Sequence, residues 1–258
     1  MLLRWSLIIS DPLGAYKLNN FCMLLANNNR SKAYLQSLIK ENLVPKNVLL
    51  LTDTKIKLPE QTENDSNILD RSEQESWVFC SVTGIKFNEK ESLSKTLTKN
   101  SIPFKIIGSS DPNDSKVTKM LKTLEEEYCI YSGPGGVILK SEIFSTRKTF
   151  IHAHPGELPN YKGSTTIYYS LLIKEVIDVS VISMSENLDS GNVLHAETMK
   201  FIPGSNIDYV IDPCVRAKAL INYLKNPKKG ESQASNGNVF YIIHPVLKHL
   251  SIIKANNH

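Results

Sequence analysis

The feature that most constrains the fold is the alternation of short apolar runs with amphipathic helical stretches along most of the chain. Short apolar runs bounded by turn formers predict buried strands, and the amphipathic stretches between them predict helices. The predicted strands are 5–9, 48–51, 77–82, 103–107, 128–131, 149–154, 177–184 and 193–202. This order predicts a Rossmann-like α/β fold, with a mostly parallel sheet and helices on both of its faces.

Apolar residues at helical spacing predict the helices. Two helices are expected between Lys17 and Leu43, separated by Asn27–Ser31, with Ser31 as the N-cap of the second. The other predicted helices are 89–99, 115–127, 164–174 and 207–224, the last of them interrupted by Pro213. Residues 55–75 form the most polar stretch and have no period, which predicts an irregular insert.

Charge and cysteine usage restrict the class of protein. The net charge of +4 is mild, and the one tight basic cluster, Lys225–Lys229, is typical of a solvated loop, so we expect no nucleic-acid partner. Four well-separated cysteines without C-x-x-C spacing suit a reducing cytoplasm. No apolar run approaches ~18 residues, and Met1–Ser10 fits a first strand better than a signal peptide. We therefore expect a cytoplasmic protein that does not cross a membrane.

A pair of histidines and one carboxylate are the candidate reaction centre. In a strand over 149–154, His152 and His154 would project from the same face, next to a break at Pro155. Asp189 follows in a turn, 35 positions after His154. The set can be interpreted as the start of a zinc site or as a metal-free centre for acyl transfer to an amine. Because no G-x-S-x-G motif is present, direct transfer is favoured over a covalent intermediate.

A second candidate feature is the turn Ser132–Gly136. Its glycines and proline allow unusual backbone angles and the close approach of a ligand to the main chain. Neither G-x-x-x-x-G-K-[ST] nor G-x-G-x-x-G is satisfied there, so the turn is not a phosphate loop of either kind.

The stretch from His154 to Ser164, His-Pro-Gly-Glu-Leu-Pro-Asn-Tyr-Lys-Gly-Ser, followed by Glu-Asn-Leu-Asp-Ser-Gly at 186–191, resembles the folate-dependent formyltransferases. That family includes glycinamide ribonucleotide transformylase, methionyl-tRNA formyltransferase and the sugar N-formyltransferases. The resemblance is good over residues 128–202 and only general over the first hundred. It implies a formyltransferase-type α/β domain over 1–205, with the insert near 55–75, and a C-terminal helical extension over 206–258 that packs on the core.

The resemblance also implies roles for particular residues. His154 and Asp189 match the catalytic histidine and aspartate of the family, and the formyl donor implied is 10-formyltetrahydrofolate. The pocket for the pterin ring would be formed by the loop after strand 128–131 and by the later turn, through Gly135, Gly136, Val137, Ile138, Leu139 and Leu188. No metal is implied.

One position departs from the family pattern. The family has an asparagine two residues before the catalytic histidine, and here that residue is His152. Asparagine there donates an N–H to the formyl oxygen, and losing such a donor typically costs ~2.7–4 kcal/mol of barrier. His152 can replace it as a donor, leave a reduced or altered activity, or mark a site that only binds. Because two imidazoles share one strand face, we expect the pair to carry at most one charge.

The expected acceptor is a small primary amine. About 56 residues follow Ile202, which we interpret as too few for the separate RNA-binding domain of the tRNA enzyme. A nucleotide-linked amino sugar is our first expectation and glycinamide ribonucleotide the second, with Lys162 as a residue that could meet a phosphate. A homodimer, a hydrolase of the formyl donor and a non-catalytic binder of folate or nucleotides stay open.

Overall fold

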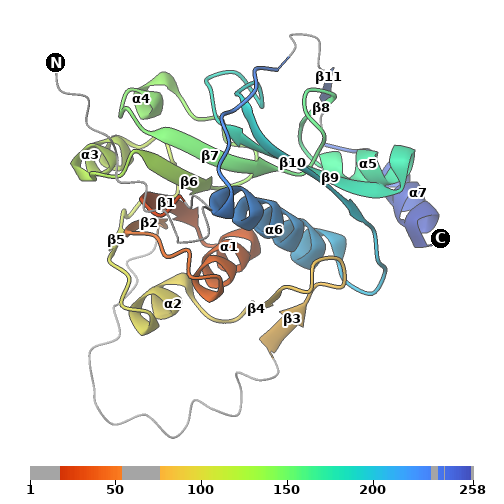
Figure 1. Cartoon of the computed structure of the whole chain (residues 1–258), viewed down its shortest axis with the longest axis horizontal. Helices are drawn as coiled ribbons and strands as arrows, with labels where there is room; N and C mark the ends of the chain where they lie inside the picture. The colour runs from red at the N-terminus through yellow and green to blue at the C-terminus, as the bar shows by residue number, and fades with distance from the viewer. Residues whose placement is uncertain (1–17, 54–75, 234–237, 241, 257–258) are drawn as a thin grey trace, which may run out of the picture.

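The computed structural model describes residues 18–53, 76–233, 238–240 and 242–256, and its centre is a seven-stranded sheet (Figure 1). The strand order is β10-β9-β7-β6-β1-β2-β5. The strands are β1 (Phe21–Ala26), β2 (Asn47–Leu51), β5 (Phe104–Ile106), β6 (Tyr128–Ser132), β7 (Thr149–His154), β9 (Val176–Ser183) and β10 (Val193–Lys200). Pairings from β5 to β7 are parallel, and β9 and β10 join by antiparallel pairings. The predicted mostly parallel sheet is confirmed.

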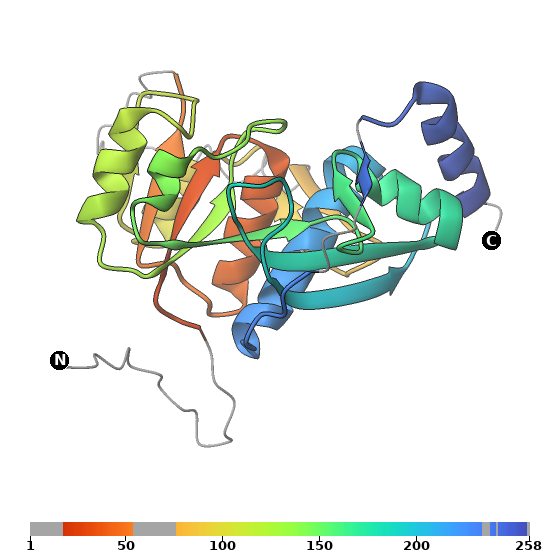
Figure 2. The same ribbon diagram turned by 90° about the horizontal axis from the view of Figure 1, so that it is seen from above.

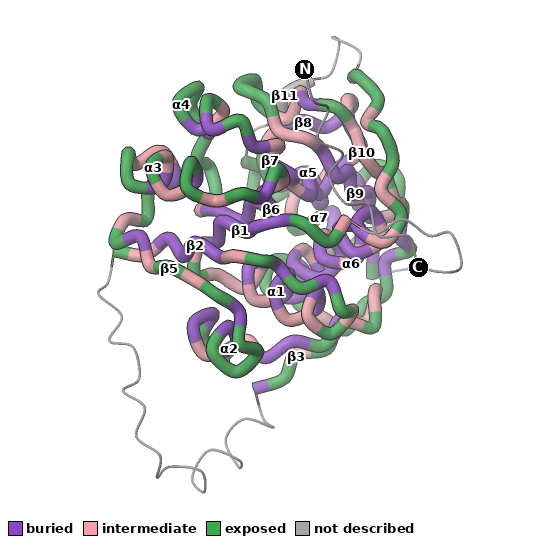
Figure 3. Tube along the Cα trace, turned by 60° about the vertical axis from the view of Figure 1, so that its left-hand side comes forward, coloured by how far each residue is buried: buried purple, intermediate pink, exposed green. Residues whose placement is uncertain are grey.

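Helices cover both faces of the sheet (Figures 1 and 2). They are α1 (Asn29–Lys40), α2 (Leu93–Lys99), α3 (Ser115–Thr123), α4 (Ser141–Phe144), α5 (Thr166–Lys174), α6 (Asp212–Lys225) and α7 (Pro245–Asn256). One buried cluster joins the sheet to α1, α2, α5 and α6, and a second joins its other face to α3 and α4. Successive residues of β1 alternate between the two clusters, as a strand covered on both faces requires. Figure 3 shows the buried residues concentrated along these strands.

The prediction of a first helix over Leu18–Leu25 is wrong, because residues 21–26 form β1. A strand buried on both faces is a continuous apolar run, and such a run has no period-two pattern to distinguish it from a helix. The predicted N-cap of the following helix, Ser31, is also wrong. The helix α1 begins at Asn29, and the side chain of Asn28, rather than that of Ser31, accepts the hydrogen bond, from the Ser31 N–H at 2.9 Å.

The strand predicted at 77–82 lies outside the main sheet. Its first three residues form β3 (Trp77–Phe79), which pairs antiparallel with β4 (Lys86–Asn88) in a small hairpin. Trp77 and Phe79 are each 52% exposed, so this apolar run is not a core strand. The strand predicted at 5–9 and the insert predicted at 55–75 lie outside the described residues.

Two helices beyond residue 205, α6 and α7, pack on the elements that precede them. A π-helical turn, Ile207–Ile211, leads into α6, and α6 packs against α1 and the strands β7 and β9. The predicted C-terminal helix is present as α7, which packs on α5. The domain boundary at 205 stays a prediction. Within the described ranges, no helix combines the length and the apolarity that crossing a bilayer requires.

A short two-stranded sheet places the motif after His154 beside the chain's later residues. The strand β8 (Tyr161–Gly163) pairs in parallel with β11 (Asn238–Phe240). The strands β1, β6 and β7 end at the same edge of the main sheet, because they are parallel. In open α/β sheets, ligands bind beyond the carboxyl ends of the strands, and the residues that follow these ends are therefore the first to consider for function.

Leu25 tests the packing of the central strand. It lies on β1 between β2 and β6 and has no exposed surface. Replacing it with alanine leaves a cavity that closely packed neighbours cannot fill, so Leu25→Ala should lower the free energy of unfolding by about 2–5 kcal/mol in urea titrations. Val44 is 43% exposed, and Val44→Ala should change the free energy of unfolding by no more than about 0.5 kcal/mol. Equal effects of the two substitutions would contradict this packing.

Candidate active site

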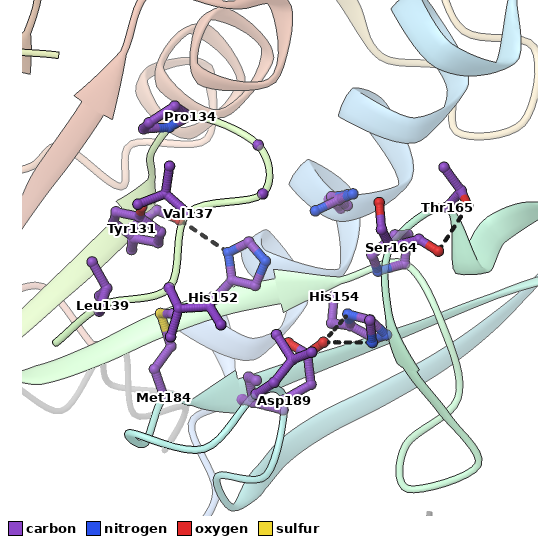
Figure 4. A pocket seen from close by; sticks show the side chains of 18 of the residues that line it. Tyr131, Pro134, Val137, Leu139, His152, His154, Ser164, Thr165, Met184 and Asp189 are labelled. Carbon is purple, nitrogen blue, oxygen red and sulfur yellow. Dashed lines mark hydrogen bonds and ion pairs between the residues drawn. The ribbon is translucent and has the colours of Figure 1, made fainter. Parts of the chain in front are cut away.

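The strand β7 delivers both histidines to one cavity of about 610 Å³. His152 and His154 line it together with Asp189, which comes from the turn between β9 and β10 (Figure 4). Both imidazoles reach the same space because residues two apart in a strand face the same way. The structure therefore brings together the three residues that the sequence indicated as a reaction centre.

His154 is held by its Nε2 atom and faces a carboxylate with its Nδ1 atom. Nε2 lies 2.6 Å from the backbone oxygen of Tyr161, and because a carbonyl oxygen can only accept, Nε2 carries the hydrogen. Nδ1 lies 3.5 Å from Oδ2 of Asp189. Burial lowers the pKa of His154 below its ordinary value of 6.5, although the carboxylate of Asp189 opposes this shift. A neutral His154 thus presents a lone pair to a carboxylate, and together the two groups can take up one proton.

The residues after His154 pack directly against its ring. A Cβ added to Gly156 would lie 2.9 Å from Nε2 of His154, so the sequence needs glycine at this position. Thr166 donates its hydroxyl hydrogen to the backbone oxygen of Pro155 at 2.8 Å and lies 3.3 Å from the same Nε2. The break in the chain after β7 therefore orients the imidazole.

Two hydrogen bonds connect the Asp189 turn to β8. The backbone N–H of Gly163 donates to Oδ2 of Asp189 at 2.8 Å, and Nζ of Lys162 lies 3.2 Å from Oγ of Ser190. From another segment of the chain, Gln233 donates to the backbone oxygen of Asp189 at 2.9 Å. The phosphate-binding role considered for Lys162 is not supported, because the side chain is buried, with 7% exposed, and holds this turn.

His152 is held by the other nitrogen of its ring. Its Nδ1 lies 3.2 Å from the backbone oxygen of Tyr131 on the neighbouring strand β6. Burial lowers the pKa of His152 well below 6.5, and the positive charges of Arg30 and Arg216 lower it further. An imidazolium at His152, one form in which it could replace the family's donor, is therefore disfavoured at neutral pH. The expectation that the two histidines carry at most one charge agrees with both pKa directions.

Two arginines that the sequence analysis missed line the same cavity. Arg30, in the first turn of α1, donates through Nε to Oγ of Ser132 at 3.0 Å. Arg216, on α6, donates through Nη1 to the backbone oxygen of Ala153 at 3.2 Å and pairs with Asp212 at 2.9 Å. The i, i+4 pair of Asp212 and Arg216 on the predicted helix is a signal that could have indicated Arg216.

The predicted folate-binding residues form another wall of this cavity. All six of them line it: Gly135, Gly136, Val137, Ile138, Leu139 and Leu188. The side chains of Val137, Ile138 and Leu188 are 36%, 55% and 40% exposed, as is typical of an apolar surface that a ligand covers. Gly136 has a φ of +75°, which favours glycine over other residues. Ile182, Met184 and Ile242 line the cavity too, and the sequence analysis missed them.

No metal centre accompanies these residues in the part of the chain that the structure describes. Across that part, no group of three or more histidine, cysteine, aspartate and glutamate side chains is placed to hold a metal ion.

Gly191 tests how tightly the Asp189 turn is built. A Cβ at this position would lie 1.6 Å from the backbone oxygen of Ser183, so Gly191→Ala must displace β9 or the turn. We expect it to lower the melting temperature and to abolish ligand binding in the cavity, measured by thermal unfolding and calorimetry. Gly135 has no neighbour within 4 Å of an added Cβ, so Gly135→Ala should leave the melting temperature unchanged. A Gly191→Ala protein with wild-type stability would contradict the geometry.

The lowered histidine pKa values predict how stability depends on pH. In the unfolded chain, His152 and His154 return to about 6.5 and bind protons more readily than in the folded protein. Their contribution to the free energy of unfolding is therefore full above pH 6.5 and is lost as the pH falls below it. The limiting slope is about 1.4 kcal/mol per pH unit for each histidine.

Chemical denaturation at pH values between about 5 and 8 measures this slope. His152→Asn should remove the contribution of one histidine to the slope of the free energy of unfolding against pH. His249, which is exposed on α7, is the matched control, and His249→Asn should leave the slope unchanged. The same slope in wild type and His152→Asn would show that the pKa of His152 is not lowered by folding.

Comparison with known proteins identifies the family. A family model described as "Formyl transferase" matches residues 27–216. Methionyl-tRNA formyltransferase of Finegoldia magna is 28% identical over 96 residues, which are 37% of this chain and 31% of the relative. The same enzyme of Buchnera aphidicola is 30% identical over 100 residues, 38% of this chain and 31% of the relative. The aligned part of the chain thus spans less than a third of the length of these relatives.

Solved structures share the fold at low identity. A Mycobacterium tuberculosis protein assigned provisionally as a sugar N-formyltransferase superposes with a TM-score of 0.51 at 10% identity, covering 91% of this chain and 86% of its own. Phosphoribosylglycinamide formyltransferase of Coxiella burnetii gives 0.51 at 15% identity, covering 80% and 84%. These likenesses extend the fold across most of the chain, and the family model matches well over half of it. The chain therefore belongs to the formyl transferase family.

Proposed function

We propose that this protein transfers a formyl group from 10-formyltetrahydrofolate to a primary amine of a small acceptor, and that His152, His154 and Asp189 are the catalytic residues. The observation that carries the proposal is the contact between Nδ1 of His154 and Oδ2 of Asp189 at 3.5 Å, inside the cavity walled by residues 135–139. A neutral imidazole beside a carboxylate can hold the proton that an amine must lose when it is acylated.

The cavity suits the folate donor in size and in lining. About 610 Å³ lies within the range of sites for ligands of this kind. The apolar side chains of Val137, Ile138 and Leu188 offer a surface for a flat ring, and the backbone around Gly136 can approach its polar edge closely. When bound, the donor supplies the formyl carbon, and Gly135, Gly136 and Leu139 would complete its pocket.

His154 and Asp189 would manage the proton of the reaction. Nε2 of His154 stays bonded to the backbone oxygen of Tyr161, which fixes the ring and directs Nδ1 at the carboxylate. As the acceptor nitrogen bonds to the formyl carbon, its proton moves to the His154–Asp189 pair. The pair later returns a proton to the leaving nitrogen of the donor, so that neither group is consumed. Such general acid–base catalysis typically contributes about 10²–10⁴-fold to the rate.

Among acceptors we propose a nucleotide-linked amino sugar. The Mycobacterium tuberculosis protein assigned provisionally as a sugar N-formyltransferase shares the fold over 91% of this chain, which supports an acceptor of this kind. Arg30 and Arg216 on the cavity wall are compatible with an acceptor that carries phosphate. Glycinamide ribonucleotide, which also carries phosphate, is the second candidate.

A formyl-transfer assay tests the proposal. The purified protein is incubated with 10-formyltetrahydrofolate and, separately, with nucleotide-linked 3-amino and 4-amino sugars, glycinamide ribonucleotide and methionyl-tRNA. We expect turnover with an amino sugar, and His154→Ala and Asp189→Asn should each lower kcat at least about 10²-fold, because each removes half of the proton-accepting pair. His249→Ala, on the exposed side of α7, should retain full activity.

Other outcomes would point elsewhere. Folate binding without turnover on any amine would favour a non-catalytic binder, and release of formate without an acceptor would favour a hydrolase. Robust turnover by His154→Ala or Asp189→Asn would mean that these residues are not the catalytic ones.

A further inference from the structure

The hydrogen bond of His152 fixes which ring nitrogen faces the ligand. Nδ1 lies 3.2 Å from the backbone oxygen of Tyr131, and that oxygen can only accept, so Nδ1 carries the hydrogen. A neutral imidazole has one ring N–H, which leaves Nε2 with a lone pair. Figure 4 shows the ring with its second nitrogen turned away from Tyr131, toward the open centre of the cavity between His154 and Ser164. The atom that faces the ligand is therefore an acceptor.

The charged and titratable groups around His152 keep it in this neutral form. Arg30 comes from α1 and Arg216 from α6, and both positive charges lower the pKa of His152, as does its neighbour His154 on β7. Tyr131, on β6, places its ring centroid 6.1 Å from that of His152, and burial raises the pKa of its hydroxyl to about 12. At neutral pH, none of these four groups is a negative charge that would stabilise an imidazolium.

Arg216 is the donor best placed beside the two histidines. Its Nη1 donates to the backbone oxygen of Ala153, the residue between His152 and His154, at 3.2 Å. Nε and Nη2 both lie 2.9 Å from Oδ1 of Asp212, so the guanidinium is fixed from its far side. These contacts use three of its five N–H groups. Arg216 lines the same cavity as both histidines, and its charge lowers the pKa of both.

We propose that His152 accepts a hydrogen bond from the attacking amine and that Arg216 donates to the formyl oxygen as negative charge develops on it. The assignment rests on the proposed function. It reverses the polarity of the hydrogen bond at position 152, where the related enzymes have a donor. The reversal follows from geometry, because Nδ1 of His152 already bonds to Tyr131 and because Arg216 donates to the backbone oxygen of Ala153, the next residue of β7.

The step balances as follows. The amine nitrogen, with one N–H held by Nε2 of His152, directs its lone pair at the formyl carbon and forms the new C–N bond. The electron pair of the C=O bond moves to the oxygen, which Arg216 stabilises, and a second amine proton moves to the His154–Asp189 pair. The C=O bond then reforms, the bond from carbon to the donor nitrogen breaks, and that nitrogen takes up the proton. The products are the N-formyl amine and tetrahydrofolate.

The first test measures the tautomer and needs no turnover. Nitrogen chemical shifts are recorded by NMR on the whole protein labelled with ¹⁵N-histidine, with His152→Asn to assign the signals. We expect His152 at pH 7 to show a protonated Nδ1 and a bare Nε2. A protonated Nε2, or an imidazolium at that pH, would overturn the proposal. Because the measurement is independent of activity, a protein that proves inactive on every amine would contradict the proposed function and leave this result standing.

The second test separates the two roles by kinetics. Arg216→Gln should lower kcat about 10²–10³-fold, as loss of an oxyanion donor typically does, with little change in KM for the amine. Arg216→Lys retains the charge and should recover part of kcat. His152→Phe keeps the ring without the lone pair and should raise KM for the amine, whereas His152→Gln, whose amide oxygen can accept, should recover part of it. Melting temperatures show that each variant is folded.

Two kinetic outcomes would overturn the assignment. Wild-type kcat in a folded Arg216→Gln variant would remove Arg216 as the donor. A kcat that falls as the pH rises in the wild type, measured at saturating amine, and no longer falls in His152→Asn would mean that His152 acts as an imidazolium, whereas the proposal requires its neutral form.

Discussion

The site depends on one carboxylate oxygen, Oδ2 of Asp189. It accepts the backbone N–H of Gly163 at 2.8 Å and lies 3.5 Å from Nδ1 of His154, so it connects three segments that are far apart in the sequence. This oxygen is therefore a polar contact shared by the end of β7, the short strand β8 and the turn after β9. Lys162 and Gln233 reinforce the turn from two sides. The contact between His154 and Asp189 thereby joins the end of a strand to two connecting segments.

Buried charge is the second constraint on this cavity. Arg30 and Arg216 keep their positive charges, because guanidinium groups stay protonated in proteins. Their effect falls on the histidines, whose pKa values lie below 6.5 because the neutral form is favoured by burial and by the neighbouring cations. A cavity with two fixed cations and two neutral imidazoles suits anionic ligands and developing negative charge. The proton-accepting role proposed for His154 and the polarity inferred for His152 share this electrostatic origin.

Several elements could be predicted because their signals are local. The strand predicted at 128–131 and the helix predicted at 115–127 are bounded by turn formers, and the structure has them as β6 (Tyr128–Ser132) and α3 (Ser115–Thr123), with the side chain of Asp114 as the N-cap of α3. The strand β1 could not be distinguished from a helix, because an apolar run buried on both faces has no alternation. The apolar run with Trp77 and Phe79 was predicted as a core strand, but it forms a hairpin outside the main sheet. The β propensity of a segment does not tell which sheet its strand joins. Arg30 lies 102 residues before Ser132 and Arg216 lies 63 residues after Ala153, and spacing along the sequence gives no sign of such contacts.

The sequence by itself determined the family, the alternating α/β architecture and which residues are the candidates for the reaction centre, because these depend on short motifs and on local periodicity. The tertiary structure decided what those residues can do. Whether His152 donates or accepts depends on the backbone oxygen of Tyr131, which lies on another strand. Whether His154 is neutral depends on its burial and on a carboxylate 35 positions away. Hydrogen-bond polarity and pKa are set by what surrounds a side chain in space, and that environment exists only once the chain has folded.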